Sequence, residues 1–539
     1  MSPFGELVND FLQAGWIHDP VMSTQMGIHD YDHHWADRTA DAIAEWGQTL
    51  QSFQGRFEQL DPAGLSRSEQ LDRRWALAVL DYLQVQHGLK LLQRSPQIPL
   101  QDVGAGVHSL LIGDFAPVET RLESVLARVR AVPSFLESAE QMLQIEEIPP
   151  VWLEASLPNA TAAQQFLAKE IPKAAADVPA LAEELVSACQ QAAQALAEYE
   201  GFLRDRGGEA QGQYAIGREN FDRILQGFHM LDMDSDDLYE FGWEWIDRYE
   251  RQMVEVAGRI DPEADWTEVL ETIKDDHPEP EGLRQAYDDE TMLARRVCLE
   301  HDLITFPDGE SCTLEWTPGF MRARVPIAQP WVSPVFESGL ASRWYITPVD
   351  DETPPERQRQ HIRDNSWAWI RGIAMHEIYP GHHLQLVLAK QLATPLRLRY
   401  WSPVFGEGWG LYTEELFYEV GLLAEPKFRL MQLRNALWRA VRIVVDIGLH
   451  ARGMTVPEAA KWLSERARLE PRWAESETHY YTTRPTYPSS YQVGFAMLLD
   501  LREQYKNQKG AQFELKTFHD ELMSYSSLPL KLVQEEMLN

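Results

Sequence analysis

Apolar residues recur at helical spacing through most of the first 300 positions of the chain. One clear example is VETRLESVLARVRAV, where charged residues separate apolar positions three or four apart: Leu122, Val125, Leu126 and Val129. This spacing lines up apolar side chains along one face of an α-helix. The segment from about 177 to 205 is rich in strong helix formers, and we expect its helix to end near Gly201. The pattern predicts amphipathic helices over most of residues 1–300.

The pattern changes between about 303 and 350, where proline is frequent and the helical spacing is lost. Two short runs there are rich in apolar and β-branched residues, CTLEW at 312–316 and SRWYITP at 342–348. Such runs between turn-forming residues are typical of short strands. We therefore expect loops with one or two strands in this region.

Helical spacing returns at about 356 and continues almost to the end of the chain. One helix start is marked by a capping box of Thr455 and Glu458, with Pro457 in the first turn. There is no internal repeat. Together these patterns predict a mainly α-helical protein with a short β-sheet.

The composition is that of a globular protein with a strongly acidic surface. Of the 539 residues, 44% are apolar and 24% are charged, which is enough apolar surface for a large core. The formal net charge is −34, and such a surface repels nucleic-acid phosphates and anionic lipid headgroups. No apolar stretch is long enough to span a membrane. We therefore expect neither nucleic acid nor a membrane as a partner.

The cysteines indicate a compartment. Cys189, Cys298 and Cys312 are far apart and form no C-x-x-C pair. This pattern fits neither a disulfide framework nor a cysteine zinc site, and it is typical of a reducing compartment. The first residues, MSPFGELVNDFLQAGW, do not predict a signal peptide because they lack a basic start followed by an apolar run. We expect a cytoplasmic protein.

The chemistry is concentrated in the segment WAWIRGIAMHEIYPGHHLQLVLAKQL, which has a helical pattern on both sides of a sharp interruption. In zinc peptidases with an H-E-x-x-H motif, two histidines one helical turn apart bind the metal and the glutamate between them acts as the base. His376 and Glu377 match the first half of this motif, but Pro380 occupies the position of the second histidine and cannot bind zinc. The second metal-binding histidine must come from further along the chain.

Two histidines follow. In a regular helix His382 would point away from His376, and His383 would share its face but lie about 10 Å further along the axis. Two nitrogens bound to one zinc ion each lie about 2.0–2.1 Å from it, so neither regular arrangement works. Pro380 and Gly381 interrupt the helix, and a widened turn there would bring His382 to the position of the second ligand. His383 is the alternative.

A third ligand is available in PVFGEGWGLYTEELFYEVGLL. Glu407 follows His382 by 25 positions, enough for one helix to end and a second to return beside it. Sites of the His, His, Glu type leave the fourth position of zinc open for water. Glu414 lies seven residues later on about the same helix face, and we expect it to support the site rather than to bind the metal.

The motifs HEIYPGHHLQ and FGEGWGLYTEEL resemble those of the large bacterial family catalogued as domain of unknown function 885 (DUF885). That family is similar to the helical gluzincin peptidases, which include oligopeptidases and angiotensin-converting enzyme. Further stretches agree along nearly the whole chain: PVMSTQMGIHDYD (20–32), RAVRIVVDIGLHARGMTVPEAA with Arg442, Asp446 and His450, PTYPSSYQVG with Pro485, Tyr491 and Gly494, and SLPLKLVQEEML. One departure is Tyr480-Tyr481, where the family pattern has an arginine; here a basic group follows only at Arg484.

The resemblance implies a fold and a metal. The fold would be a large helical metallopeptidase with a central channel, formed by residues 1–539 as a single integrated unit. Within it, residues 1–300 would be mostly helical walls, and residues 301–539 would carry the metal site and the catalytic groups. The metal would be zinc, with three protein ligands: His376, His382 and Glu407.

The predicted catalytic residues have roles in the hydrolysis of a peptide bond. Glu377 would take a proton from the metal-activated water and pass it to the leaving amine. The developing oxyanion needs a donor, for which Tyr491 is the first candidate and His450 or Tyr480 the second. The spacing favours a different interpretation of His450, as an interior histidine whose tautomer is fixed by Asp446.

Substrate contacts are predicted at three positions: Tyr345, Tyr480 and Arg484. The strand around Tyr345 would bind an extended peptide backbone by pairing along its edge. The helices ahead of the motif would admit only short peptides to the channel. A separate cluster has a metal-like composition but no regular spacing, so we interpret it as a solvated loop: His29, Asp30, Asp32, His33 and His34.

The leading function is therefore that of a zinc-dependent peptidase acting on short peptides. A second hypothesis keeps the zinc and replaces the peptide by an amide or ester in a small metabolite. A third is a non-catalytic helical binding protein. Glu377 argues against the third hypothesis, because a purely structural zinc site needs no base and is normally closed by four protein ligands.

Overall fold

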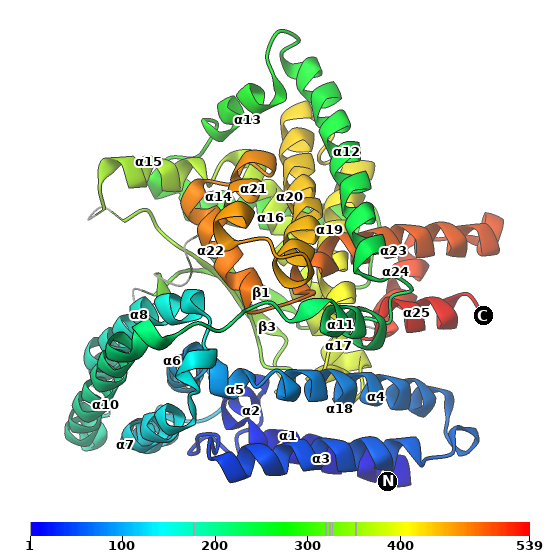
Figure 1. Cartoon of the computed structure of the whole chain (residues 1–539). Coiled ribbons are helices and arrows are strands. Elements are labelled where there is room, and N and C mark those ends of the chain that lie inside the picture. The colour runs from blue at the N-terminus through cyan, green and yellow to red at the C-terminus, as the bar shows by residue number, and fades with distance from the viewer. Residues whose placement is uncertain are drawn as a thin grey trace. The chain divides into compact units, whose positions relative to one another are not determined.

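The computed structural model describes residues 2–175, 178–318, 321–322, 325, 327–350, 353–525 and 527–539. Helices dominate it, so the predicted fold class is confirmed as mainly α-helical (Figure 1). The chain divides into two compact units: Met1–Ile216 with Pro334–Ser338, and Gly217–Ser333 with Gly339–Asn539. The central channel and the functional division at residue 300 stay predictions.

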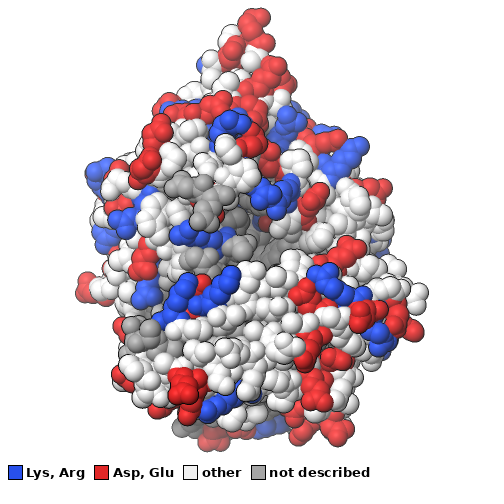
Figure 2. All heavy atoms as spheres, turned by 90° about the vertical axis from the view of Figure 1, so that its left-hand side faces the viewer, with Lys and Arg blue, Asp and Glu red and all other residues white. Residues whose placement is uncertain are grey.

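The surface carries the acidic excess. Figure 2 shows acidic and basic side chains interspersed on one face, with acidic side chains gathered at the tip where α12 (Ser235–Ile260) leads into α13 (Trp266–Lys274). Three exposed acidic residues lie in that connection: Asp261, Glu263 and Asp265. In the part of the chain that the structure describes, no helix is both long and apolar enough to cross a membrane.

The first unit consists of helices and loops in its described residues. Its helices are α1 (Pro3–His18), α2 (Pro20–Met26), α3 (Ala40–Glu58), α4 (Arg67–Gly88), α5 (Leu91–Arg94), α6 (Gln97–Ile112), α7 (Val118–Met142), α8 (Pro150–Gln165), α9 (Ile171–Ala175) and α10 (Pro179–Arg206). α7 packs against α6 and α10, and α3 packs against α4. The apolar stripe predicted in VETRLESVLARVRAV is buried in α7.

The end predicted for α10 is wrong. The helix continues through Gly201 to Arg206, because Leu203 extends the buried face that Leu196 and Tyr199 begin. A single glycine inside a helix costs about 1 kcal/mol relative to alanine, less than the burial of one large apolar side chain. Position 177, where the predicted helix starts, lies outside the described residues.

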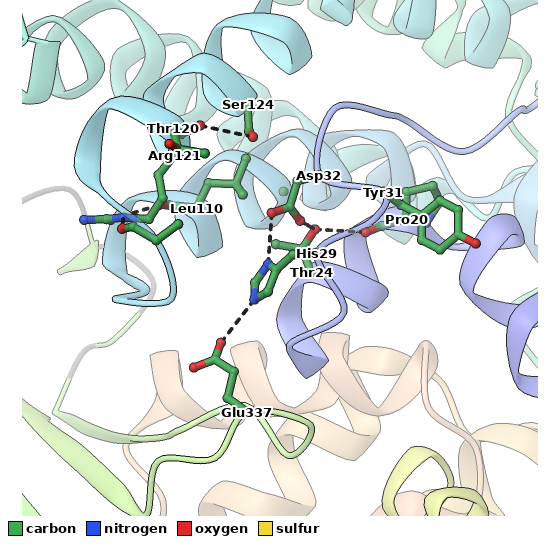
Figure 3. A network of polar contacts seen from close by, with 12 residues as sticks. Pro20, Thr24, His29, Tyr31, Asp32, Leu110, Thr120, Arg121, Ser124 and Glu337 are labelled. Carbon is green, nitrogen blue, oxygen red and sulfur yellow. Dashed lines mark hydrogen bonds and ion pairs between the residues drawn. The ribbon is translucent and has the colours of Figure 1, made fainter.

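A polar network holds the chain between α2 and α3 (Figure 3). Thr24 donates to Asp32 Oδ1 at 2.6 Å, and the other carboxylate oxygen of Asp32 lies 2.9 Å from His29 Nδ1. His29 Nε2 lies 3.4 Å from Glu337 Oε1 in the segment Pro334–Ser338. Burial lowers the pKa of His29, but its hydrogen bonds to Asp32 and Glu337 outweigh this effect and raise the pKa to about 9.

The solvated loop predicted for this stretch is only partly right. Asp30, His33 and His34 are exposed, as expected. Asp32 is buried, because Thr24 and His29 satisfy its carboxylate. Among the described residues, no three of these side chains form a candidate metal group.

The second unit contains the remaining helices and the sheet. Its helices besides α12 and α13 are α11 (Gly217–Arg223), α14 (Leu283–Glu300), α15 (Pro355–Arg363), α16 (Trp367–Glu377), α17 (His382–Leu392), α18 (Pro395–Arg399), α19 (Pro403–Glu419), α20 (Pro426–Ala451), α21 (Val456–Arg466), α22 (Pro471–Thr482), α23 (Tyr487–Lys509), α24 (Leu515–Ser524) and α25 (Leu530–Met537). The capping box predicted at Thr455 begins α21.

α20 is the central helix of this unit. Every residue from Phe428 to His450 is buried, and α20 packs against α12, α16, α22 and α23. α19 packs closely along α23. These contacts place α16, α19 and α23, the helices that carry most of the predicted site, around one core.

The sheet has three strands, β1 (Ser311–Trp316), β2 (Ala328–Val332) and β3 (Ala341–Ile346), in the order β1-β3-β2. β1 and β3 confirm the two predicted strands, whereas the proline-containing β2 was not predicted. β3 pairs with β1 on one side and with β2 on the other. The predicted edge pairing of a peptide at Tyr345 is therefore wrong, because β3 has no free edge.

Candidate metal centre

The HEIYPGHH motif lies where α16 and α17 meet. α16 ends at Glu377 and α17 begins at His382, so the interruption predicted from Pro380 and Gly381 is confirmed. The Tyr379–Pro380 peptide bond is cis. Because the break replaces a regular helical turn, the direction of the His382 side chain is not fixed by the axis of α16.

A close approach of the backbone requires glycine in this break. A Cβ atom added to Gly381 would lie 1.9 Å from the carbonyl oxygen of His376. The amide of Gln385 donates to the Gly381 carbonyl at 3.0 Å and restarts the helical pattern. Trp409 of α19 donates its indole N–H to the Pro380 carbonyl oxygen at 2.9 Å, so a carbonyl in the break is satisfied.

The three side chains predicted as metal ligands lie together. His376, His382 and Glu407 each offer one ligand atom, and these atoms all lie within 4.8 Å of one another. His382 Nε2 and Glu407 Oε2 are 3.4 Å apart. Ligands at 2.0–2.1 Å from a tetrahedral zinc ion are separated by roughly 3.3 Å. Small side-chain movements would therefore fit this group to one zinc ion.

Two residues of α19 orient the His376 ring. Its Nδ1 lies 2.9 Å from Glu414 Oε1, so the N–H donates to the carboxylate and Nε2 is left for a metal. Glu414 is 2% exposed. A Cβ atom on Gly410 would lie 2.6 Å from Cε1 of the same ring, so glycine makes room for it. Glu414 thus contacts a ligand and is not part of the metal group, as expected.

The charges at the site favour a cation. Burial lowers the pKa of His382, but Glu407 and Glu377 outweigh this effect and raise the pKa to about 9. Burial raises the pKa of Glu407, but His382 and Tyr487 lower it to about 2. Glu407 is therefore ionised, the state in which a carboxylate binds a metal. The negative charge that favours a proton on His382 also favours a metal ion there.

Glu377 is the last residue of α16 and is half-buried. Its carboxylate forms no hydrogen bond or ion pair with any residue that the structure describes. Its charge acts on His382. A general base needs this combination, a carboxylate that is close to the metal and not committed to a structural contact. Its catalytic role stays a prediction.

His383 belongs to a different polar network. It is fully buried, with Nδ1 2.7 Å from Ser342 Oγ and Nε2 3.1 Å from Glu310 Oε2. Tyr379 also donates to Glu310 Oε2, at 2.8 Å. Since both ring nitrogens of His383 are engaged, the geometry favours His382 as the second ligand.

A row of tyrosines leads from an exposed position to His376. Tyr480 is 40% exposed, and its ring centroid lies 6.3 Å from that of Tyr487. Tyr487 is 6.0 Å from Tyr491, which lies parallel to His376 at 6.5 Å. The guanidinium of Arg484 lies 5.0 Å from the Tyr480 ring centroid. The structure therefore brings Tyr480, Arg484 and Tyr491 towards the metal group.

His450 and Tyr345 lie outside this row. His450 is 1% exposed, and its Nε2 lies 2.9 Å from the Tyr481 carbonyl oxygen, between α20 and α22. Asp446, which we expected to contact His450, accepts a hydrogen bond from Ser489 at 2.7 Å. Tyr345 is 3% exposed in the central strand. The catalytic role of His450 stays a prediction.

Tyr487 is a site residue that was not predicted. Its hydroxyl donates to Glu407 Oε1, and its ring contacts Tyr491. One signal for it was present in the sequence: Tyr487 and Tyr491 are four residues apart at the start of α23, and residues at this spacing share a helix face.

The fold and the site together define a mainly helical protein with a candidate His-His-Glu metal centre. The model of the family described as bacterial protein of unknown function (DUF885) matches residues 20–537. The chain belongs to this family, and the resemblance predicted from its motifs is confirmed.

Two solved structures are similar over the whole chain. A candidate lipoprotein of unknown function from Shewanella oneidensis is 21% identical, with a TM-score of 0.82 and coverage of 100% of both chains. A candidate lipoprotein from Colwellia psychrerythraea is 17% identical, with a TM-score of 0.86 and coverage of 99% of this chain and 98% of that one. At these identities the similarity shows the fold alone. A search of curated proteins finds no match.

Proposed function

We propose that the chain is a zinc-dependent hydrolase that cleaves peptide bonds of short peptides. The observation that carries the proposal is the grouping of His376, His382 and Glu407 within 4.8 Å. Beside it lies the carboxylate of Glu377, which forms no hydrogen bond or ion pair with the residues that the structure describes. Three protein ligands leave one position open, which is typical of catalytic zinc sites. A bound zinc ion would supply Lewis-acid activation of a water molecule and of the scissile carbonyl.

The chain's own residues would move the protons. Glu377 accepts a proton from the attacking water and delivers it to the leaving amine, so that a neutral amine departs. Glu414 holds the His376 ring through Nδ1, which keeps Nε2 directed at the metal group. Tyr487 donates to one carboxylate oxygen of Glu407, and the other carboxylate oxygen of Glu407 faces His382.

Tyr491 is our candidate donor to the developing oxyanion. Its ring lies parallel to His376 at 6.5 Å, on the side of the metal group that α23 covers. Two arginines lie near this ring, Arg442 at 4.4 Å and Arg439 at 5.9 Å from its centroid. Nearby positive charge favours a hydroxyl that donates to an anion. Tyr480 is the second candidate.

The alternatives keep the same site. A zinc hydrolase of a small amide or ester would use the same ligands and the same base. A non-catalytic binding protein of this fold would have no use for the uncommitted Glu377. The peptidase is favoured because His376 and Glu377 match the first half of the zinc-peptidase motif and because two histidines and a glutamate are a ligand set of catalytic zinc sites in peptidases.

The experiment that tests the function replaces the base and keeps the ligands. The zinc-loaded protein is assayed on a panel of short peptides and acylated small molecules, as wild type and as Glu377→Gln. We expect the wild type to cut peptides and the variant to lose at least about 10²- to 10⁴-fold in kcat, the usual contribution of a general base. Zinc content, measured by elemental mass spectrometry, should be equal in both.

The matched control is Glu475→Gln, the same change at an exposed position of α22, which should keep full activity. Turnover that survives Glu377→Gln would show that Glu377 is not the base. Cleavage of a non-peptide amide with no peptide cut would replace the peptidase by the small-amide hydrolase.

We also propose a cytoplasmic location, on the pattern of the cysteines. The two similar solved structures are described as candidate lipoproteins, which favours the cell envelope as the alternative. Fractionation of cells that produce the protein from its native gene separates the two: recovery with the envelope would contradict the cytoplasmic location.

A further inference from the structure

Two buried arginines of α20, Arg434 and Arg439, form no ion pair with a carboxylate of the described residues, and Arg439 is the one that lies beside the metal centre. Arg439 is 4% exposed. Its Nη1 donates to the Asn435 carbonyl oxygen of the same helix at 3.3 Å, and its Nε has no hydrogen-bond partner among the described residues. By contrast, Arg442 donates to Tyr481 Oη at 2.7 Å and to Glu477 Oε2 at 3.0 Å. Arg442 is thus neutralised within the fold, and Arg439 is not.

An unpaired guanidinium in this environment is unfavourable on its own. Burial lowers the pKa of Arg439, while the charge of Glu414 opposes this effect and that of Arg442 adds to it. Arginine nevertheless stays protonated in proteins. A buried cation without a counter-ion is costly, and its planar fork of donors matches a carboxylate. The guanidinium of Arg439 is therefore suited to bind an anion.

Two separate contacts place Arg439 beside the metal centre. Its guanidinium lies 5.9 Å from the ring centroid of Tyr491, and that ring lies 6.5 Å from the ring of His376. The carboxylate of Glu414, which acts electrostatically on Arg439, is hydrogen-bonded to the same histidine.

We propose that Arg439 binds a carboxylate of the substrate, next to the bond that is cleaved. This proposal deepens the proposed function and rests on it. The ligand class is a short peptide whose free C-terminal carboxylate lies one or two residues beyond the scissile bond. Each residue of an extended chain spans about 3.3–3.6 Å, so a carboxylate one or two residues beyond the scissile bond would reach a group that lies next to the metal centre.

A carboxylate near the scissile bond could also come from the side chain of an aspartate or glutamate in the substrate. The C-terminus is favoured, because it also explains why only short peptides would be processed: the chain cannot continue past a buried arginine. Recognition of the C-terminus makes the enzyme an exopeptidase that releases one or two residues.

The test measures binding separately from turnover. Calorimetry compares N-acetyl-trialanine, its C-terminal amide, and the same amide with its last alanine replaced by glutamate. Each is titrated into zinc-loaded Glu377→Gln, with and without Arg439→Gln. We expect the free acid to bind roughly 10- to 100-fold more tightly than the amide, as for a hydrogen bond to a charged group, and Arg439→Gln to remove this preference. Arg439→Lys should keep part of it.

The matched control is Arg434→Gln. Arg434 is also 4% exposed on α20, and its Nε also has no hydrogen-bond partner among the described residues. Its guanidinium donates to Asn435 Oδ1 and to the Arg468 carbonyl oxygen, both at 3.1 Å, and it lies over Trp438 and Trp473 instead of Tyr491. This variant should keep the preference for the free acid. Circular dichroism of each variant shows whether it is folded.

Equal binding of acid and amide by the Glu377→Gln protein would overturn the inference. So would an equal loss of both on Arg439→Gln, because Arg439 would then act only through Glu414 and His376. Tight binding of the glutamate amide alone would assign Arg439 to an acidic side chain rather than the C-terminus. Wild type that binds the free acid through Arg439 but cuts no peptide would reject the proposed function and leave the carboxylate site standing.

Discussion

At the scale of single residues, the orientation of His376 depends on a carboxylate that does not bind the metal. Glu414 Oε1 accepts a hydrogen bond from Nδ1 of His376 at 2.9 Å in a place where Glu414 is 2% exposed. This bond selects the tautomer with a free Nε2 and makes the ring more basic. Glu414 is therefore expected to contribute to metal affinity.

Replacing Glu414 by glutamine tests this contribution. The amide keeps an acceptor oxygen but loses the charge, so zinc affinity should fall about tenfold, the lower end of the usual range for such partners of a metal-binding histidine. Competition with a zinc chelator measures the affinity, with Glu475→Gln as the control. An unchanged affinity would show that the Glu414 contact does not orient the ligand.

Local spacing was sufficient to identify members of the candidate metal group. His376 and Glu407 could be predicted from two short motifs. Arg439 could not be predicted. It lies beside Tyr491 without a carboxylate partner among the described residues, and only the packing of α20 against α23 reveals this position.

At the scale of elements, the break between α16 and α17 is held by a carboxylate from the start of the sheet. Glu310 directly precedes β1, and its side chain is 1% exposed. It accepts hydrogen bonds from Tyr379 and His383, which lie on either side of the Pro380–His382 stretch, and from Arg295 at 2.8 Å. The sheet thus contributes to the position of His382.

The ionisation of Glu310 should be visible in the pH dependence of stability. Burial raises its pKa, but hydrogen bonds from His383, Arg295 and Tyr379 outweigh this effect and lower it to about 2. A lowered pKa in the folded state stabilises the fold above the unfolded pKa of about 4.3, and this stabilisation is lost as the pH falls from about 5 to 2.

We therefore expect zinc-free wild type to exceed zinc-free Glu310→Gln in free energy of unfolding by about 2–3 kcal/mol at pH 7. The difference should shrink towards zero near pH 2. Chemical denaturation at a series of pH values measures it. A difference that does not change with pH would mean that the charge of Glu310 does not stabilise the break.

The elements themselves were largely predictable, and the failures have physical causes. Helical spacing identified α7, α16, α17 and α21, and Pro380 with Gly381 identified the break. β2 was missed because Pro330 removes a backbone donor and interrupts the pattern of a strand. The edge pairing at Tyr345 failed because the order of strands in a sheet follows from tertiary packing and not from the strand sequence.

At the scale of the whole molecule, contacts between distant parts of the sequence decide what each unit contains. The segment Pro334–Ser338 belongs to the first unit, where Glu337 contacts His29 across 308 positions of sequence. No local pattern predicts such a pairing. For the same reason the loop at 29–34 was interpreted as solvated, although Asp32 is buried within it.

The net charge of −34 also acts at this scale. An acidic surface lowers the local concentration of anionic substrates, and this effect is screened by salt. A buried Arg439 that binds a carboxylate would offset the repulsion at the site itself. The charge of the surface alone would favour cationic substrates. The proposed preference of Arg439 for peptides with a free C-terminal carboxylate is therefore a property of the site and not of the surface.

We propose that His376, His382 and Glu407 bind one zinc ion. The metal content of the purified protein, measured by elemental mass spectrometry for wild type, His382→Gln and His383→Gln, tests this proposal. Because the two adjacent histidines receive the same substitution, each variant loses one imidazole and changes the side-chain volume by the same amount. A difference in zinc content between them therefore depends on the position alone.

We expect about one zinc per chain in the wild type and its loss in His382→Gln. Folded His383→Gln should retain zinc, because the His383 ring contacts Ser342 and Glu310 and not the metal group. No zinc in the wild type, even after zinc is added, would contradict the metal centre and with it the proposed hydrolase. Loss of zinc in folded His383→Gln but not in His382→Gln would contradict the ligand set.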